Sequence, residues 1–161
     1  MRSISDLEFA RKIALDLLSV RPRSEAELRT ALAKKQVPDE IVDELCERFT
    51  DVGLLDDAAF AATLATSRSQ HSGRGRMRIR QELRQKGVDD EVAAEALEGI
   101  TVDDELEAAR VVATKKQRSL SGLEPHVARR RLMGVLARRG FSSSVVMQVT
   151  DETLLGLEAD E

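Results

Sequence analysis

The chain has 161 residues, of which 42% are hydrophobic and 34% charged, with a formal net charge of −4. This apolar content suffices to bury a core, so a disordered chain is excluded. Aromatic residues make up only 2%, with no Trp or Tyr, so the core must consist of Leu, Val, Ile and Ala. Such a core favours an all-α fold over a β-sandwich or barrel. The one cysteine, Cys46, excludes an internal disulfide framework and a multi-cysteine zinc site.

The chain contains no run of 18 apolar residues, so we expect no membrane-spanning segment. Residues 1–6 lack an apolar signal core, which predicts a cytoplasmic protein.

Residues 1–53 are predicted to form a first repeat of three helices. The expected buried faces are Phe9, Ile13 and Leu17 in its first helix, with Ala10, Ala14 and Leu18 beside this stripe, and Ile41, Leu45 and Phe49 in its third. The second helix ends in a basic turn, and Gln36 stands at the left-handed position that follows it. Asp39 is a suitable cap for the third helix.

Residues 54–101 are predicted to form a second repeat. Asp56 or Asp57 is expected to cap its first helix, and a glycine-rich loop near residues 70–75 precedes its second. Gly87 stands where a left-handed residue ends the second helix. The third helix follows Asp89, and its expected buried face is Val92, Ala96 and Ile100.

Residues 102–161 are predicted to form a third repeat with an acidic tail. Asp103 or Asp104 is expected to cap its first helix, and Gly140 ends its second. Serines at 142–144 open the third helix, which buries Val145 and Val149.

One segment of each repeat aligns with those of the other two without gaps, around one apolar position, Val37, Val88 and Phe141. The spacings are 51 residues (37 to 88) and 53 residues (88 to 141). A unit of about 50 residues is near the lower limit for independent folding, so each repeat should bury part of its surface on its neighbour. Tandem repeats of this kind predict an elongated, curved array.

Charge is strongly sorted along the chain. Residues 39–57 carry eight acids and one base, and residues 89–107 carry nine acids and no base. By contrast, residues 68–86 carry seven bases and one acid, and residues 115–139 carry eight bases and one acid. One interpretation is that the basic side chains are solvated or pair with the acidic blocks.

The other interpretation is a polyanion-binding surface. Arg76, Arg80 and Arg84 follow the spacing i, i+4, i+8, where like charges repel unless a partner compensates them. Arginine predominates over lysine, which suits bidentate binding to phosphate or carboxylate. The candidate contact residues are Arg74, Arg76, Arg78, Arg80, Arg84, Lys86, Lys115, Lys116, Arg129, Arg130, Arg131, Arg138 and Arg139. No aromatic residues are interleaved among them, so DNA contacts would be directed to the backbone and steeply salt-dependent.

No catalytic or cofactor-binding constellation is recognisable, so we expect neither an enzyme nor a cofactor. His71 and His126 have no metal-ligand neighbour at i+3 or i+4. The segment Gly73–Arg76 is similar to the start of a phosphate-binding loop but lacks the third glycine and a preceding strand. The acidic pairs fall at predicted helix starts, where capping is the simpler interpretation.

Two segments of the second repeat carry a family resemblance. Phe49 followed by Gly53–Ala61, and Gly73 followed by Arg78–Val88, resemble the RecX regulatory proteins of bacteria, and the resemblance covers roughly residues 6–150. It implies a tandem array of three-helix units and a non-enzymatic modulator of the RecA recombinase. Such proteins lie in the helical groove of the RecA–DNA filament, and most inhibit its ATP hydrolysis and strand exchange, in DNA recombination, repair and the SOS response.

The resemblance therefore assigns the candidate cations to contacts with RecA or with single- or double-stranded DNA, made by a monomer. Inhibition and stimulation of the recombinase both remain open at this point. The alternative is a helical DNA-binding protein that acts without a recombinase, because three-helix units with a basic helix also describe helix-turn-helix readers.

Overall fold

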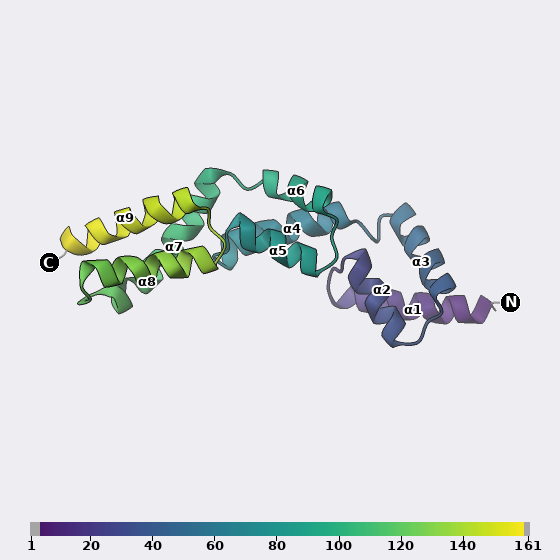
Figure 1. The fold of residues 1–161 in the computed structure, drawn as a ribbon. Coiled ribbons are helices and arrows are strands. Elements are labelled where there is room, and N and C mark those ends of the chain that lie inside the picture. Colours follow the sequence, from purple (N-terminus) through teal and green to yellow (C-terminus); the bar gives the residue numbers. More distant parts are fainter. Residues whose placement is uncertain (1–3, 160–161) are drawn as a thin grey trace. The chain divides into compact units, whose positions relative to one another are not determined.

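A computed structural model of the chain describes residues 4–159, and this part of the chain is helical, without strands (Figure 1). The prediction of an all-α fold is therefore confirmed. The helices are α1 (Ile4–Val20), α2 (Glu25–Lys34), α3 (Asp39–Asp51), α4 (Asp57–His71), α5 (Arg76–Gln85), α6 (Asp90–Glu98), α7 (Val102–Leu120), α8 (Pro125–Arg138) and α9 (Ser143–Ala159). The last two acids of the predicted acidic tail lie outside the described residues.

The chain forms two compact units. Unit 1 contains the residues up to Ala61 together with Leu83–Ala93, and unit 2 contains Ala62–Glu82 together with the residues from Ala94 onward. Helices α4, α5 and α6 each contribute residues to both units.

Unit 1 has its core among α1, α2 and α3. Its buried residues are Ala10, Ala14, Leu28, Leu32, Ile41, Val42, Leu45, Cys46, Phe49 and Leu55. The predicted buried face of the third helix is confirmed, and Cys46 is a buried free thiol. The predicted face of the first helix is wrong at Phe9, which is 67% exposed, because the chain buries the adjacent small residues Ala10 and Ala14 instead.

The predicted buried face of the third helix of this repeat is confirmed at Ile100, which is buried just beyond α6, and is wrong within α6. There Ala93 and Leu97 are buried, whereas Val92 and Ala96 are only half-buried. Both patterns satisfy helical spacing, so the short helix could not be oriented from its sequence alone.

Unit 2 has its main core where α7, α8 and α9 pack against one another (Figure 1). Leu132 and Leu136 of α8 and Val149 of α9 are fully buried, and Phe141 fills the turn between these helices. The predicted buried positions Val145 and Val149 are confirmed.

Acidic residues start several helices, although not always in the predicted role. Asp56 accepts a hydrogen bond from Ala59 N at 3.0 Å, which confirms it as the cap of α4. The prediction for Asp39 is wrong, because Pro38 precedes α3 and makes no side-chain cap bond.

The start of α7 also differs from the prediction. Thr101 caps this helix, and Asp104 returns a hydrogen bond to Thr101 N at 2.9 Å, which completes a capping box. At the start of α9, the buried carboxylate of Glu105 accepts a hydrogen bond from Ser142 N at 3.4 Å.

The turn that follows the second helix of each repeat is left-handed in all three. The φ angle is +62° at Gln36, +78° at Gly87 and +92° at Gly140. In each turn the next residue donates its N–H to a carbonyl five residues earlier, as Val88 N does to Leu83 O at 3.0 Å. The repeat predicted from the sequence is therefore a repeat of backbone conformation.

Candidate functional site

In unit 2, the α4–α5 loop and the α8–α9 turn lie backbone to backbone, in what we call the Gly75–Gly140 junction. Gly75 N donates to Arg139 O at 2.9 Å, and Met77 N donates to Gly140 O at 3.1 Å. A Cβ atom added to Gly140 would lie 2.3 Å from the backbone nitrogen of Arg78. Only glycine allows this approach, so Gly140 is required both for its positive φ and for the contact.

Unit 1 contains a corresponding contact, the Ser24–Gly87 junction. Ser24 Oγ donates to Lys86 O, and a Cβ atom on Gly87 would lie 2.3 Å from Cβ of Ala26. Asp57 accepts a hydrogen bond from Glu25 N at 2.9 Å, so its carboxylate stabilises the start of α2 rather than its own helix. Burial raises the pKa of Asp57 above its ordinary range, although the bond from Glu25 N opposes this.

Cations at the Ser24–Gly87 junction form ion pairs with acidic side chains. Glu27 pairs with Arg21 at 3.3 Å and with Lys86 at 3.5 Å. Burial by itself would raise the pKa of Glu27, but the hydrogen bonds from Arg21 and Ser24 N and the charge of Lys86 together hold it below its ordinary value. Arg84 lies 3.3 Å from Asp90 in an exposed ion pair.

Arginines at the Gly75–Gly140 junction form no such ion pairs with described residues. The Nε atoms of Arg74 and Arg76 are buried without a hydrogen-bond partner. Arg78 donates to the Gln81 amide oxygen at 3.0 Å, and Arg139 donates to Ser72 O at 3.1 Å. Both of these hydrogen bonds go to neutral groups, and within the described residues neither these four arginines nor Arg138 takes part in an ion pair.

The thirteen predicted contact residues therefore fall into three groups. Arg84, Lys86 and Arg129 form ion pairs, with Arg129 lying 2.7 Å from Asp151. Four half-buried arginines, Arg74, Arg76, Arg78 and Arg139, surround the Gly75–Gly140 junction. The remaining six are exposed and form no ion pair with any described residue: Arg80, Lys115, Lys116, Arg130, Arg131 and Arg138.

Other cations of unit 2 occupy several of its acids. Arg68 lies 2.9 Å from Glu82, and Arg110 lies 2.9 Å from Glu152. The hydrogen bond from Arg110 lowers the pKa of Glu152. The six exposed cations thus place positive charge on α5, α7 and α8 that no ion pair with a described residue neutralises.

Two of these cations share a face of α8 with a glycine. Arg130, Gly134 and Arg138 follow the spacing i, i+4, i+8. The guanidinium of Arg138 lies over Gly134, since a Cβ atom there would be 3.0 Å from its Nη1. The glycine in the middle of this helix therefore makes room for a folded-back arginine.

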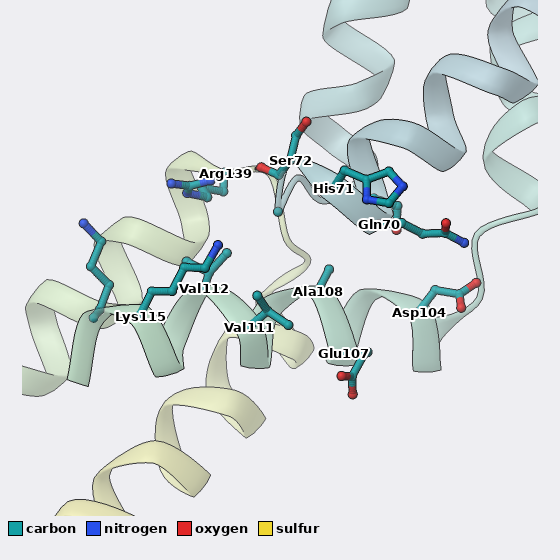
Figure 2. Close-up of a pocket in the computed structure, with 13 residues that line it drawn as sticks. Gln70, His71, Ser72, Asp104, Glu107, Ala108, Val111, Val112, Lys115 and Arg139 are labelled. Carbon is teal, nitrogen blue, oxygen red and sulfur yellow. Dashed lines mark hydrogen bonds between the residues drawn. The ribbon is translucent and has the colours of Figure 1, made fainter. Parts of the chain in front are cut away.

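Sequence reasoning missed a cleft in unit 2 between the end of α4 and one face of α7, which we call the α4–α7 cleft. It encloses about 740 Å³. Figure 2 shows Asp104 at the end nearer Gln70 and His71, and Lys115 at the end nearer Arg139. The helical spacing of these α7 residues was visible in the sequence, but the opposing wall comes from a loop whose path was not.

Two further observations bear on the class of protein. Within residues 4–159, no cluster of three His, Cys, Asp or Glu side chains is arranged to hold a metal ion. The described helices include none with the length and apolar character needed to cross a membrane.

Comparison with known proteins identifies the family. Models of three RecX three-helix domains match the chain in order: the first over residues 10–49, the second over 56–97 and the third over 103–150. The chain belongs to the RecX family. The resemblance found in the sequence, and the three-helix repeats inferred from it, are confirmed.

Relatives named regulatory protein RecX match this chain over most of their length. The regulatory protein RecX of Thermobifida fusca is 39% identical over 155 residues, which cover 94% of this chain and 83% of the relative. That of Streptomyces coelicolor is 37% identical over 148 residues, covering 92% and 79%. These RecX relatives are named regulatory proteins rather than enzymes.

Solved RecX structures share the fold. The crystal structure of RecX from Lactobacillus salivarius superposes with a TM-score of 0.87 at 23% identity, covering 95% of this chain and 99% of that one. A second crystal structure, of a regulatory protein RecX, gives a TM-score of 0.84 at 29% identity over 91% of this chain and 73% of that one.

Proposed function

We propose that this chain regulates the RecA recombinase by binding in the groove of the RecA–DNA filament and inhibiting its ATP hydrolysis and strand exchange. It acts as a monomer of three modules, with boundaries at residues 1–53, 54–101 and 102–161, in the bacterial cytoplasm and without a cofactor. Membership of the RecX family supports this proposal, because the resemblance implies a modulator of RecA.

The observation that carries the proposal is the uncompensated positive charge of unit 2. Six exposed cations on α5, α7 and α8 form no ion pair with a described residue, and several acids of the same unit are already paired with other arginines. Like charges on one helix face cost a few tenths of a kcal/mol per pair, which a polyanionic partner would offset. A nucleoprotein filament presents both DNA phosphates and protein carboxylates to such a surface.

A titration of the protein into an ATPase assay of the cognate recombinase on single-stranded DNA tests the proposal. We expect ATP hydrolysis to fall as the protein is added, at concentrations below those that coat bare DNA. Strand exchange should fall over the same range. An ATPase rate that stays constant at saturating protein would contradict the proposal.

The salt dependence of binding to bare DNA separates the proposal from a helical DNA-binding protein that needs no recombinase. Contacts with phosphates alone should weaken steeply between low and physiological salt. Tight, sequence-selective binding that persists at physiological salt would favour the independent DNA-binding protein.

A further inference from the structure

One wall of the α4–α7 cleft is a continuous face of α7. Asp104, Ala108, Val111 and Lys115 lie along it at intervals of three or four residues. From Asp104 to Lys116 the face is about 18 Å long, the length of a helical segment of about 12 residues. Ala108 and Val112 are buried in its middle, and Val111 remains 44% exposed there.

The opposite wall is the last turn of α4 and the loop that follows it. Gly73 approaches so closely that a Cβ atom on it would lie 2.7 Å from Val112 Cγ2. This loop is fixed by the bond from Arg139 to Ser72 O, and Arg74 N donates to Arg68 O at 3.1 Å. The cleft is therefore a groove with one helical wall and one anchored wall.

Charge along the groove changes sign from one end to the other. Asp104 and Glu107 line one end, whereas Lys115, Lys116 and Arg139 line the other (Figure 2). A DNA strand would bring phosphates towards the two carboxylates, and no described Phe, Tyr or Trp side chain lines the groove to stack on a base. A protein segment can match both ends and also cover the apolar middle.

We infer that the α4–α7 cleft is a docking groove for a helical segment of the partner protein, with an apolar side chain over Val111 and carboxylates on Lys115 and Lys116. This inference rests on the proposed function, because the segment belongs to the recombinase of the filament. It divides the cations of unit 2: Lys115 and Lys116 contact protein, and the arginines of α5 and α8 are left to contact DNA.

The substitution Val111→Asp tests the inference, because it places a carboxylate in the apolar middle at an exposed helix position. Binding is measured to the recombinase filament assembled on single-stranded DNA with a non-hydrolysable ATP analogue, and separately to the same bare DNA. We expect filament affinity to fall about tenfold or more, with bare-DNA affinity unchanged. The double variant Lys115→Glu, Lys116→Glu should show the same selective loss.

Val52→Asp is the matched control, since Val52 is 71% exposed and lies in unit 1, outside the cleft. It should bind both probes like the wild type, and circular dichroism should show that all variants remain folded. Wild-type filament affinity in Val111→Asp would overturn the inference and leave the proposed function standing. An equal loss of bare-DNA affinity in the cleft variants would also overturn it, by making the cleft a nucleic-acid site. If the wild type itself does not bind the filament, the proposed function fails and the inference fails with it.

Discussion

The Ser24–Gly87 junction of unit 1 and the Gly75–Gly140 junction of unit 2 share a backbone arrangement and differ in charge. In each, a left-handed glycine turn lies within van der Waals contact of the start of an earlier helix. In unit 1, Glu27 forms ion pairs with both Arg21 and Lys86. In unit 2, the arginines around Gly140 form no ion pair with a described residue.

This difference separates the backbone contact that joins two modules from the cations that are available to bind a partner. Because unit 1 makes the same kind of contact with its cations in ion pairs, a left-handed glycine turn packed against an earlier helix does not require unpaired cations around it. Unpaired, half-buried arginines lower stability unless a partner compensates them. The comparison therefore supports a binding role for the cations of unit 2.

The largest predicted effect comes from Gly140→Ala. The left-handed φ of +92° and the clash with Arg78 N should together lower the free energy of unfolding by about 3 kcal/mol. Urea denaturation followed by circular dichroism measures this loss.

Gly134→Ala is the matched control, because it makes the same change in α8 at a helical position. Its Cβ meets only the flexible end of Arg138, so we expect stability to rise by about 0.5 to 1 kcal/mol. Equal effects of the two substitutions would show that the junction does not require glycine.

The next effect concerns the hydrogen bond that Asp57 accepts from Glu25 N at the start of α2. Asp57→Ala removes the acceptor for Glu25 N and should cost about 1 kcal/mol. Asp57→Asn keeps an acceptor oxygen, and burial already disfavours the ionised carboxylate, as its raised pKa indicates. We therefore expect the Asn variant to unfold within about 0.5 kcal/mol of the wild type. A loss as large as that of Asp57→Ala would show that the carboxylate charge, and not the hydrogen bond, stabilises α2.

A smaller effect is expected at Gln36, the counterpart of Gly87 and Gly140. Its turn is left-handed and its side chain is exposed, so a residue other than glycine is tolerated there. Gln36→Gly relieves a left-handed penalty of roughly 1 kcal/mol and adds freedom to the unfolded chain, so stability should rise by about 0.5 kcal/mol. A decrease in the unfolding midpoint would mean that the Gln36 side chain contributes contacts of its own.

The smallest effect is the pH dependence due to Glu27. Because its pKa is lowered in the folded state, its contribution is present above its ordinary pKa of about 4.5 and is lost as the pH falls through the lowered value. Glu27→Gln should therefore cost a few tenths of a kcal/mol at neutral pH, and this cost should shrink as the pH falls below the ordinary pKa of the carboxyl. A difference in unfolding free energy that stays constant throughout an acid titration would contradict this linkage.

Features that repeat along the chain could be predicted from the sequence. The spacing of Val37, Val88 and Phe141 marked the three helix–turn units, and Gly87 and Gly140 marked their left-handed turns. The face of α6 could not be predicted, because adjacent stripes of small residues fit the helical period equally well. The orientation of α1 was mispredicted since its core positions are alanines rather than the larger Phe9.

The candidate site was predictable as a list of basic residues but not as groups within it. Charge counts identified the basic blocks, whereas the pairing of Lys86 with Glu27 depends on two segments 59 residues apart. The role of Asp57 also depends on a distant partner, the N–H of Glu25. The α4–α7 cleft needed the path of the 72–75 loop, which short polar and glycine residues do not specify.

Charge reversal in unit 2, compared with charge reversal in unit 1, tests most directly the claim that the unpaired cations of unit 2 bind the recombinase filament. The unit 2 variant carries Arg80→Glu, Arg130→Glu and Arg131→Glu, and its control in unit 1 carries Arg11→Glu, Lys12→Glu and Lys34→Glu, all at exposed positions. Recombinase ATPase on single-stranded DNA is measured with each protein titrated in. We predict that the unit 2 variant no longer inhibits while the unit 1 variant inhibits like the wild type. Inhibition that survives in the unit 2 variant would contradict the account.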